Sequence, residues 1–103
     1  MKDLSVEAYE TMSEDGVVGL FFKTPFCGTC QLAEQLLNLT FQALDGKGTP
    51  TYMCRAGEWE EYLSEWRIES VPCLIFVKDG QVLEKLYAFE SVTKLYQLYQ
   101  HYQ

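Results

Sequence analysis

The chain has 103 residues, of which 48% are hydrophobic and 22% are charged, and its formal net charge is −7. These values predict one globular domain, residues 1–103, and argue against a disordered chain. They also argue against a nucleic-acid partner, because phosphate backbones are bound by clustered Lys and Arg, and the chain has 8 of these against 15 acidic residues. No secretory leader and no run near the ~20 apolar residues of a membrane span is present. We therefore expect a cytoplasmic protein with no membrane partner, although an exported protein lacking its signal peptide would look the same.

The first half of the chain predicts a helix, a strand and a second helix. Ser5 can cap a short helix that ends at Asp15-Gly16. Residues 17–23 are almost continuously apolar, which is typical of a central strand buried on both faces. A longer helical pattern runs from residue 31 to 44 and stops at Asp45-Gly46. Two interleaved apolar rows give this helix one broad apolar face: Leu32, Leu36, Leu39 and Ala43, and Ala33, Leu37, Phe41 and Leu44.

The second half of the chain adds strands beside the first one. Residues 49–54 are rich in strand formers and predict a second strand. Because a helix separates it from the strand at residues 17–23, we expect the two strands to be parallel and joined by a right-handed crossover. Residues 58–66 predict a short covering helix with an aromatic face. Two further strands, 73–77 and 82–87, are joined at a hairpin turn.

A final helix capped by Ser91 completes this order. The succession of helix, strand, helix, strand, helix, hairpin and helix predicts an α/β domain with a mixed sheet flanked by helices on both faces.

The chemical interest of the sequence lies in Cys27-Gly28-Thr29-Cys30, placed where a strand becomes a helix. The positive end of a helix stabilises a thiolate, which is the reactive form in disulfide exchange. A close pair of this kind indicates a redox pair, half of a metal site, or two inert cysteines. Cys54 and Cys73 are predicted in strands on opposite sides of residues 17–23. They would be about 9.5 Å apart, beyond the ~7 Å limit for a disulfide, so we expect both to be reduced.

These features resemble the thioredoxin family, which has the same cysteine spacing at a strand-to-helix junction within βαβ. The segment Ser70-Val71-Pro72, immediately before the hairpin strands, supports the resemblance, which spans nearly the whole chain. It implies the thioredoxin fold, with a central mixed four-stranded sheet whose extra N-terminal strand is short or absent. It also implies a cis peptide bond at Pro72, facing Cys27 and Cys30.

By the same resemblance, Cys27 is the attacking thiol and Cys30 the buried resolving thiol. Substrate binding is expected at Phe26, Gly28, Thr29 and Val71, with the Val71 backbone pairing with an extended peptide. Cys73 follows Pro72 and could act as a third thiol, yet Cys is also a common small hydrophobic residue in buried strands.

The sequence departs from the family pattern at three places near the redox pair. Phe26 stands where Trp is usual and Thr29 where Pro is usual, so a redox potential cannot be borrowed from relatives. Phe21 occupies the position, six residues before Cys27, of a buried Asp that assists the second cysteine. The Lys partner of that Asp is replaced by Met53 or Cys54.

These observations predict a thiol–disulfide oxidoreductase that needs no cofactor and no metal. Its partners would be protein disulfides and an electron donor such as a reductase, and the chain would be a monomer. Thr29 lacks the imidazole found in oxidising relatives, so we expect a reductant. Two other interpretations stay open: a metal or iron–sulfur module using the same cysteines, and an adaptor of this fold with weak redox activity because of Phe21. Lys23 is isolated in the sequence and indicates no role.

Overall fold

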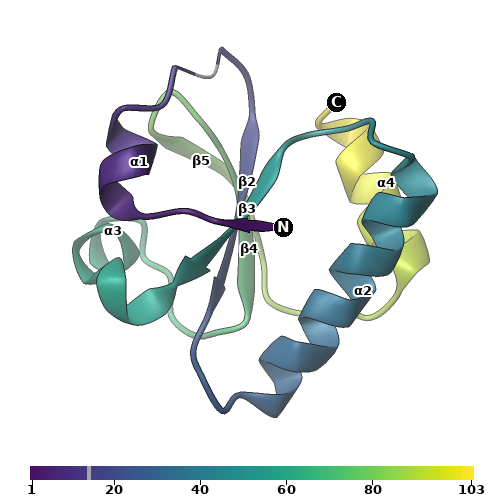
Figure 1. Ribbon diagram of the computed structural model, residues 1–103, viewed down its shortest axis with the longest axis horizontal. Helices are drawn as coiled ribbons and strands as arrows, with labels where there is room; N and C mark the ends of the chain where they lie inside the picture. Colours follow the sequence, from purple (N-terminus) through teal and green to yellow (C-terminus); the bar gives the residue numbers. More distant parts are fainter. Residues whose placement is uncertain (14) are drawn as a thin grey trace.

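The computed structural model describes residues 1–13 and 15–103 and contains a five-stranded sheet with helices on both faces (Figure 1). The strand order is β1-β3-β2-β4-β5, in which β1, β3 and β2 run parallel and β4 and β5 are antiparallel to their neighbours. The strands are β1 (Lys2–Asp3), β2 (Val18–Lys23), β3 (Thr51–Arg55), β4 (Cys73–Lys78) and β5 (Gln81–Leu86). The predicted α/β architecture is confirmed, and β1 is the short extra N-terminal strand.

Helices α1 and α3 cover one face of the sheet, and α2 and α4 cover the other (Figure 1). Their bounds are α1 (Val6–Glu10), α2 (Gly28–Leu44), α3 (Glu60–Glu65) and α4 (Val92–His101), with a short 3-10 turn, η1 (Ala56–Glu58), before α3. Ser5 and Ser91 cap α1 and α4 as predicted, since each hydroxyl accepts a backbone N–H at 3.1 Å. No helix in the described part of the chain is long and apolar enough to cross a membrane.

Helix α1 is shorter than the sequence predicts. It ends at Glu10, and the Thr11 hydroxyl donates a hydrogen bond to the Glu7 carbonyl oxygen at 3.1 Å. The helix thus stops before Asp15-Gly16, so the expected end at that dipeptide is wrong.

Strand β2 divides the hydrophobic core into two clusters. Phe21 faces α2 and α4, whereas Leu20 and Phe22 face α1 and α3. Burial of each of these large side chains stabilises the fold by about 1.5–3 kcal/mol. The continuous apolar run therefore marks a central strand, as predicted. Its end at Lys23 positions the loop that leads to Cys27.

The aromatic residues of the predicted helix 58–66 pack against α1. Tyr9 contacts Trp59, Tyr62 and Trp66 with ring centroids 5.5–5.8 Å apart. The expected single helix is divided at Trp59, which separates η1 from α3. This aromatic group belongs to the core, in agreement with its helical spacing.

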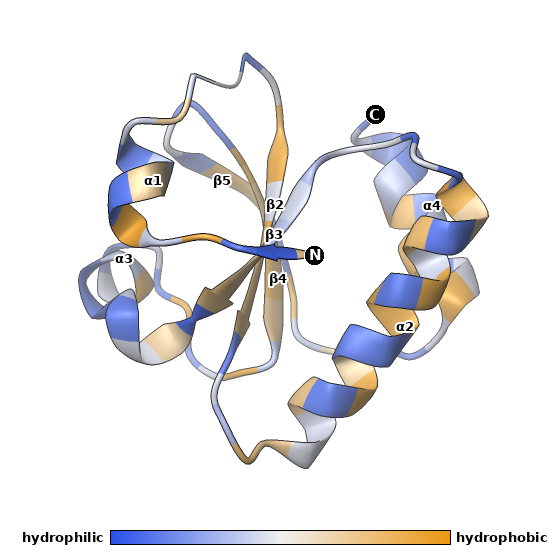
Figure 2. Cartoon of the chain, viewed as in Figure 1, coloured by the Kyte–Doolittle hydropathy of each residue, from blue (hydrophilic) through white to orange (hydrophobic). Residues whose placement is uncertain are grey.

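Only one of the two apolar rows of α2 is buried. Ala33, Leu37 and Leu44 pack against the sheet, whereas Leu32 is 58% exposed and Leu39 is 51% exposed. Hydrophilic and hydrophobic segments alternate along α2 in Figure 2. The prediction of one broad buried face is therefore wrong for the row that contains Leu32 and Leu39, because α2 touches the sheet along one side only.

Candidate active site

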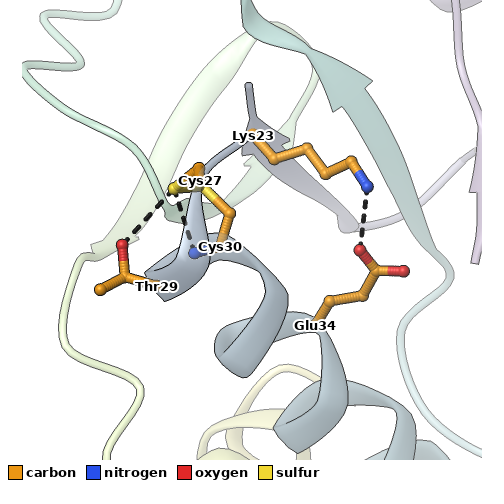
Figure 3. The surroundings of a disulfide bond; sticks show 5 residues. All are labelled: Lys23, Cys27, Thr29, Cys30 and Glu34. Carbon is orange, nitrogen blue, oxygen red and sulfur yellow. Dashed lines mark hydrogen bonds and ion pairs between the residues drawn. A yellow bond between two sulfur atoms is a disulfide. The ribbon is translucent and has the colours of Figure 1, made fainter. Parts of the chain in front are cut away.

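The redox cysteines lie at the first turn of α2, directly after the loop that leaves β2. Helix α2 begins at Gly28, three residues earlier than the sequence pattern suggests, and Cys27 is its N-cap. The Cys27 sulfur accepts a hydrogen bond from the Cys30 backbone N–H at 3.1 Å, as Figure 3 shows. A backbone N–H that has no partner within the helix is thereby directed at sulfur, which favours negative charge on Cys27.

Cys27 and Cys30 form a disulfide, with their Cα atoms 5.2 Å apart. The two residues differ in exposure, because Cys30 is 1% exposed whereas Cys27 is only partly buried. The Thr29 hydroxyl lies 3.4 Å from the Cys27 sulfur. Of the two cysteines in the disulfide, Cys27 is therefore the one that is accessible from solvent.

Phe26 precedes the pair in an unusual conformation. Its φ angle is +61°, in the left-handed region that bulky residues avoid, and its side chain is 100% exposed. Gly28 is also exposed, and an added Cβ would meet no atom within 4 Å. Phe26 thus presents its aromatic ring to solvent directly before Cys27.

A groove of about 350 Å³ runs beside the redox pair between α2 and the segment after β5. Pro72, whose peptide bond with Val71 is cis, lines it together with Thr29. The other lining residues are mostly apolar: Leu32, Ala33, Leu36, Tyr87, Phe89 and Glu90. Of the residues predicted for substrate binding, only Thr29 lines this groove, while Phe26, Gly28 and Val71 lie outside its lining.

Sequence reasoning missed most of this groove. The spacing of Leu32 and Leu36 places them on the apolar face of the helix, but it does not show which part of that face stays open to solvent. Tyr87 and Phe89 gave no signal, because only the fold brings the end of β5 next to α2.

The position of the family's buried acid is entirely apolar. Phe21 is fully buried, and its ring meets Phe89 edge-on at 5.7 Å. Its neighbour in register on β3 is Met53, which packs against the same cluster. In this register Met53 pairs with Phe21, whereas Cys54 pairs with Phe22.

Cys54 and Cys73 are free, buried thiols on either side of Phe22. Their strands flank β2 on opposite sides, as predicted, so the two cannot be bridged. Burial raises the pKa of both thiols; that of Cys73 reaches about 11, against the lowering effects of a hydrogen bond with Tyr87 and the charge of Lys85. Cys73 faces the α1 and α3 side of the sheet, whereas Cys30 lies on α2. Its role as a third thiol stays a prediction.

Among residues 1–13 and 15–103, no three His, Cys, Asp or Glu side chains are grouped so that they could hold a metal ion. One ion pair does lie close to the disulfide. Lys23, the last residue of β2, meets Glu34 of α2 at 3.0 Å (Figure 3).

Comparison with known proteins agrees with this geometry. The Thioredoxin family model matches residues 3–101. The thioredoxin-like protein YusE of Bacillus subtilis is 38% identical over 98 residues, covering 95% of this chain and 90% of that protein. Thioredoxin of the same organism is 26% identical over 92 residues, covering 89% of this chain and 88% of its own. Among solved structures, oxidised mitochondrial thioredoxin 3 of Saccharomyces cerevisiae has a TM-score of 0.75 at 19% identity, covering 98% of this chain and 94% of that one. With a redox-capable cysteine pair at the family position, the chain belongs to the thioredoxin family of thiol–disulfide oxidoreductases.

Proposed function

We propose that the protein reduces disulfides in other proteins, with Cys27 as the attacking thiol and Cys30 as the resolving thiol. The observation that carries this assignment is the capping bond: the Cys27 sulfur accepts the Cys30 N–H at the start of a 17-residue helix, and it is the less buried of the two. The helix end stabilises a thiolate at Cys27 and so activates it.

The exchange proceeds in two steps. The Cys27 thiolate attacks one sulfur of the substrate disulfide, forms a mixed disulfide, and releases the other substrate sulfur as a thiolate that takes a proton from water. Cys30 then gives its proton to solvent, attacks the Cys27 sulfur, and releases the second substrate thiolate, which is protonated in turn. Two electrons and two protons pass to the substrate, and Cys27 and Cys30 are left as the disulfide seen here.

Substrate docking is supported by the surface around the pair. The groove beside Pro72 and Thr29 is lined mainly by apolar side chains and fits an apolar side chain of the substrate. Phe26 offers a second apolar contact on account of its full exposure. The Val71 backbone, next to the cis bond, would pair with the extended substrate chain.

The remaining partners follow from this chemistry. A disulfide form needs a source of two electrons, and we propose an external reductase for that step. We also propose a monomeric protein that works in the cytoplasm without metal or cofactor.

Two single substitutions test the assigned roles. Cys30→Ser leaves the mixed disulfide without its resolving thiol, so it should accumulate covalent complexes with a protein disulfide substrate on non-reducing gels. Cys27→Ser should form none, and Cys54→Ser is the control that should behave as the unmodified protein does. If Cys30→Ser traps no substrate, or if Cys27→Ser still catalyses reduction, the assignment is wrong.

A further inference from the structure

The ion pair of Lys23 and Glu34 brackets the redox pair in the chain. Lys23 lies four residues before Cys27, and Glu34 lies four residues after Cys30. On a helix, residues four apart share a face, and their Cα atoms are about 6 Å apart. Glu34 therefore lies one turn further along α2 than Cys30, and its carboxylate holds the Lys23 ammonium group at 3.0 Å. The Lys23 side chain extends away from the Cys27 sulfur toward Glu34 (Figure 3).

The ion pair lies on the same face of the sheet as Phe21, which occupies the position of the family's buried Asp. Phe21 and Lys23 are two residues apart on β2, so their side chains point to the same face, which is the one covered by α2. Phe21 is apolar, and Lys23 is one step nearer to the loop that carries Cys27. On this face of β2 the charged side chain is therefore Lys23, at the edge of the site, whereas the buried position is occupied by the apolar Phe21.

Partial burial strengthens the effect of these charges. The Lys23 and Glu34 side chains are 29% and 30% exposed, and they form the least exposed of the ion pairs found between described residues. Charges screened only in part by water act on their neighbours over several ångströms.

We propose that Lys23 and Glu34 jointly set the acidity of the redox thiols. The Lys23 ammonium group stabilises the thiolate that exists once the disulfide is reduced. Glu34 limits this stabilisation, because it holds the ammonium group and carries the opposite charge. The inference rests on the proposed dithiol exchange and adds the groups that tune it.

The other charged groups near this end of the sheet are already engaged or more exposed. Arg55 is the β3 neighbour of Lys23 in register, but it is 68% exposed and pairs with Asp3 and Glu58. Its charge therefore acts mainly on those two carboxylates.

Across the site, the groove contains one carboxylate and one phenol. Glu90 pairs with Lys94 at 3.0 Å, and the Tyr87 hydroxyl accepts a hydrogen bond from the Glu69 N–H at 3.2 Å. The Cys73 thiol faces the opposite cluster. Lys23 is consequently the cation that the β2–α2 junction itself supplies.

The test measures the acidity of the Cys27 thiol in the reduced protein from its thiolate absorbance as a function of pH. Lys23→Met should raise the midpoint by about one pH unit, and Glu34→Gln should lower it by a similar amount. The double variant should return close to the unmodified protein, and Lys23→Arg, which keeps the charge, should do the same. The reduction potential should become more negative in Lys23→Met and less negative in Glu34→Gln, because a stabilised thiolate favours the reduced form.

Matched controls remove the same charges at exposed positions elsewhere. Lys78→Met at the far end of β4 and Glu61→Gln on α3 should leave the midpoint unchanged. The inference is overturned if the variants at the ion pair shift the midpoint no more than these controls do, or if both shift it in the same direction. Trapping by Cys30→Ser separates the two proposals: trapping without these shifts refutes the tuning role alone, whereas failure to trap refutes the dithiol mechanism.

Discussion

Phe26 has two energetically unfavourable features, and residues with such features are common at functional sites. Its left-handed backbone is unfavourable for an aromatic residue, by about 1–3 kcal/mol, and its ring is fully exposed to water. The cost of exposure is offset if the ring is covered when a substrate protein docks beside Cys27.

Replacing Phe26 by Gly should therefore separate stability from binding. Gly adopts a positive φ freely, so the free energy of unfolding should stay the same or rise by up to about 1 kcal/mol. Loss of the ring removes about 1–2 kcal/mol of apolar contact and should raise the KM for a protein disulfide about 5- to 30-fold. Denaturant unfolding and steady-state reduction measure the two effects, with Phe26→Trp as the control that keeps an aromatic surface. Equal KM values for Gly and Phe would contradict the binding role.

The two free thiols should be silent in the folded protein. Burial raises the pKa of Cys54 and Cys73, so both are protonated at neutral pH, and a protonated thiol is a poor nucleophile. At neutral pH the reduced protein should incorporate one alkyl group rapidly, at Cys27, whereas denaturant should expose all four cysteines. Modification of Cys73 in the native state should be slow at neutral pH and should speed up steadily as the pH rises toward about 11, where half of the thiol is ionised. Peptide mass mapping after alkylation gives the answer, and rapid native labelling of Cys73 would indicate an accessible third thiol.

Helix α2 has three tasks along its length. At its N-terminus the Cys30 N–H donates a hydrogen bond to the Cys27 sulfur. Its buried row, including Leu37, packs against the sheet, and its outer row, including Leu32, lines the groove. Because the two rows are interleaved in sequence, composition alone could not distinguish them.

A substitution in the buried row should lower stability, whereas one in the outer row should weaken the reduction of protein disulfides. Leu37→Ala leaves a cavity in the core and should lower the free energy of unfolding by about 2–5 kcal/mol. Leu32→Ser, on the exposed row, should change it by less than about 0.5 kcal/mol while weakening reduction of protein disulfides. Thermal unfolding and the reduction assay distinguish them, with reduction of a small disulfide as the control reaction. A stability loss in Leu32→Ser as large as that in Leu37→Ala would show that the outer row also belongs to the core.

Across the molecule, sequence patterns predicted what depends on local periodicity. The buried run of β2, the caps Ser5 and Ser91, and the cysteine pair at the helix start are all visible in the chain itself. The end of α1 at Glu10 was missed because residues 11–13 contain no glycine or proline that would mark it. The division at Trp59 was missed because the helical spacing of the aromatic residues continues through this position.

The site was predictable to a smaller extent than the fold. Cys27 and Cys30 are marked by their spacing, but Lys23 and Glu34 meet only because β2 and α2 lie side by side. The groove likewise joins residues of α2 to Tyr87 and Phe89, more than fifty positions further along the chain. Contacts of this range are set by topology, which no short window of sequence contains.

The proposed function requires that Cys27 and Cys30 interconvert reversibly between dithiol and disulfide while the rest of the fold stays intact. The most direct test is equilibration of the protein in glutathione buffers of graded redox poise, followed by acid quenching, alkylation and mass measurement. We expect a single transition in which two thiols per chain appear together. It should be the same whether the titration starts from the oxidised or from the reduced protein. A pair that remains a disulfide, remains reduced, or yields only mixed disulfides with glutathione across the whole range would contradict it.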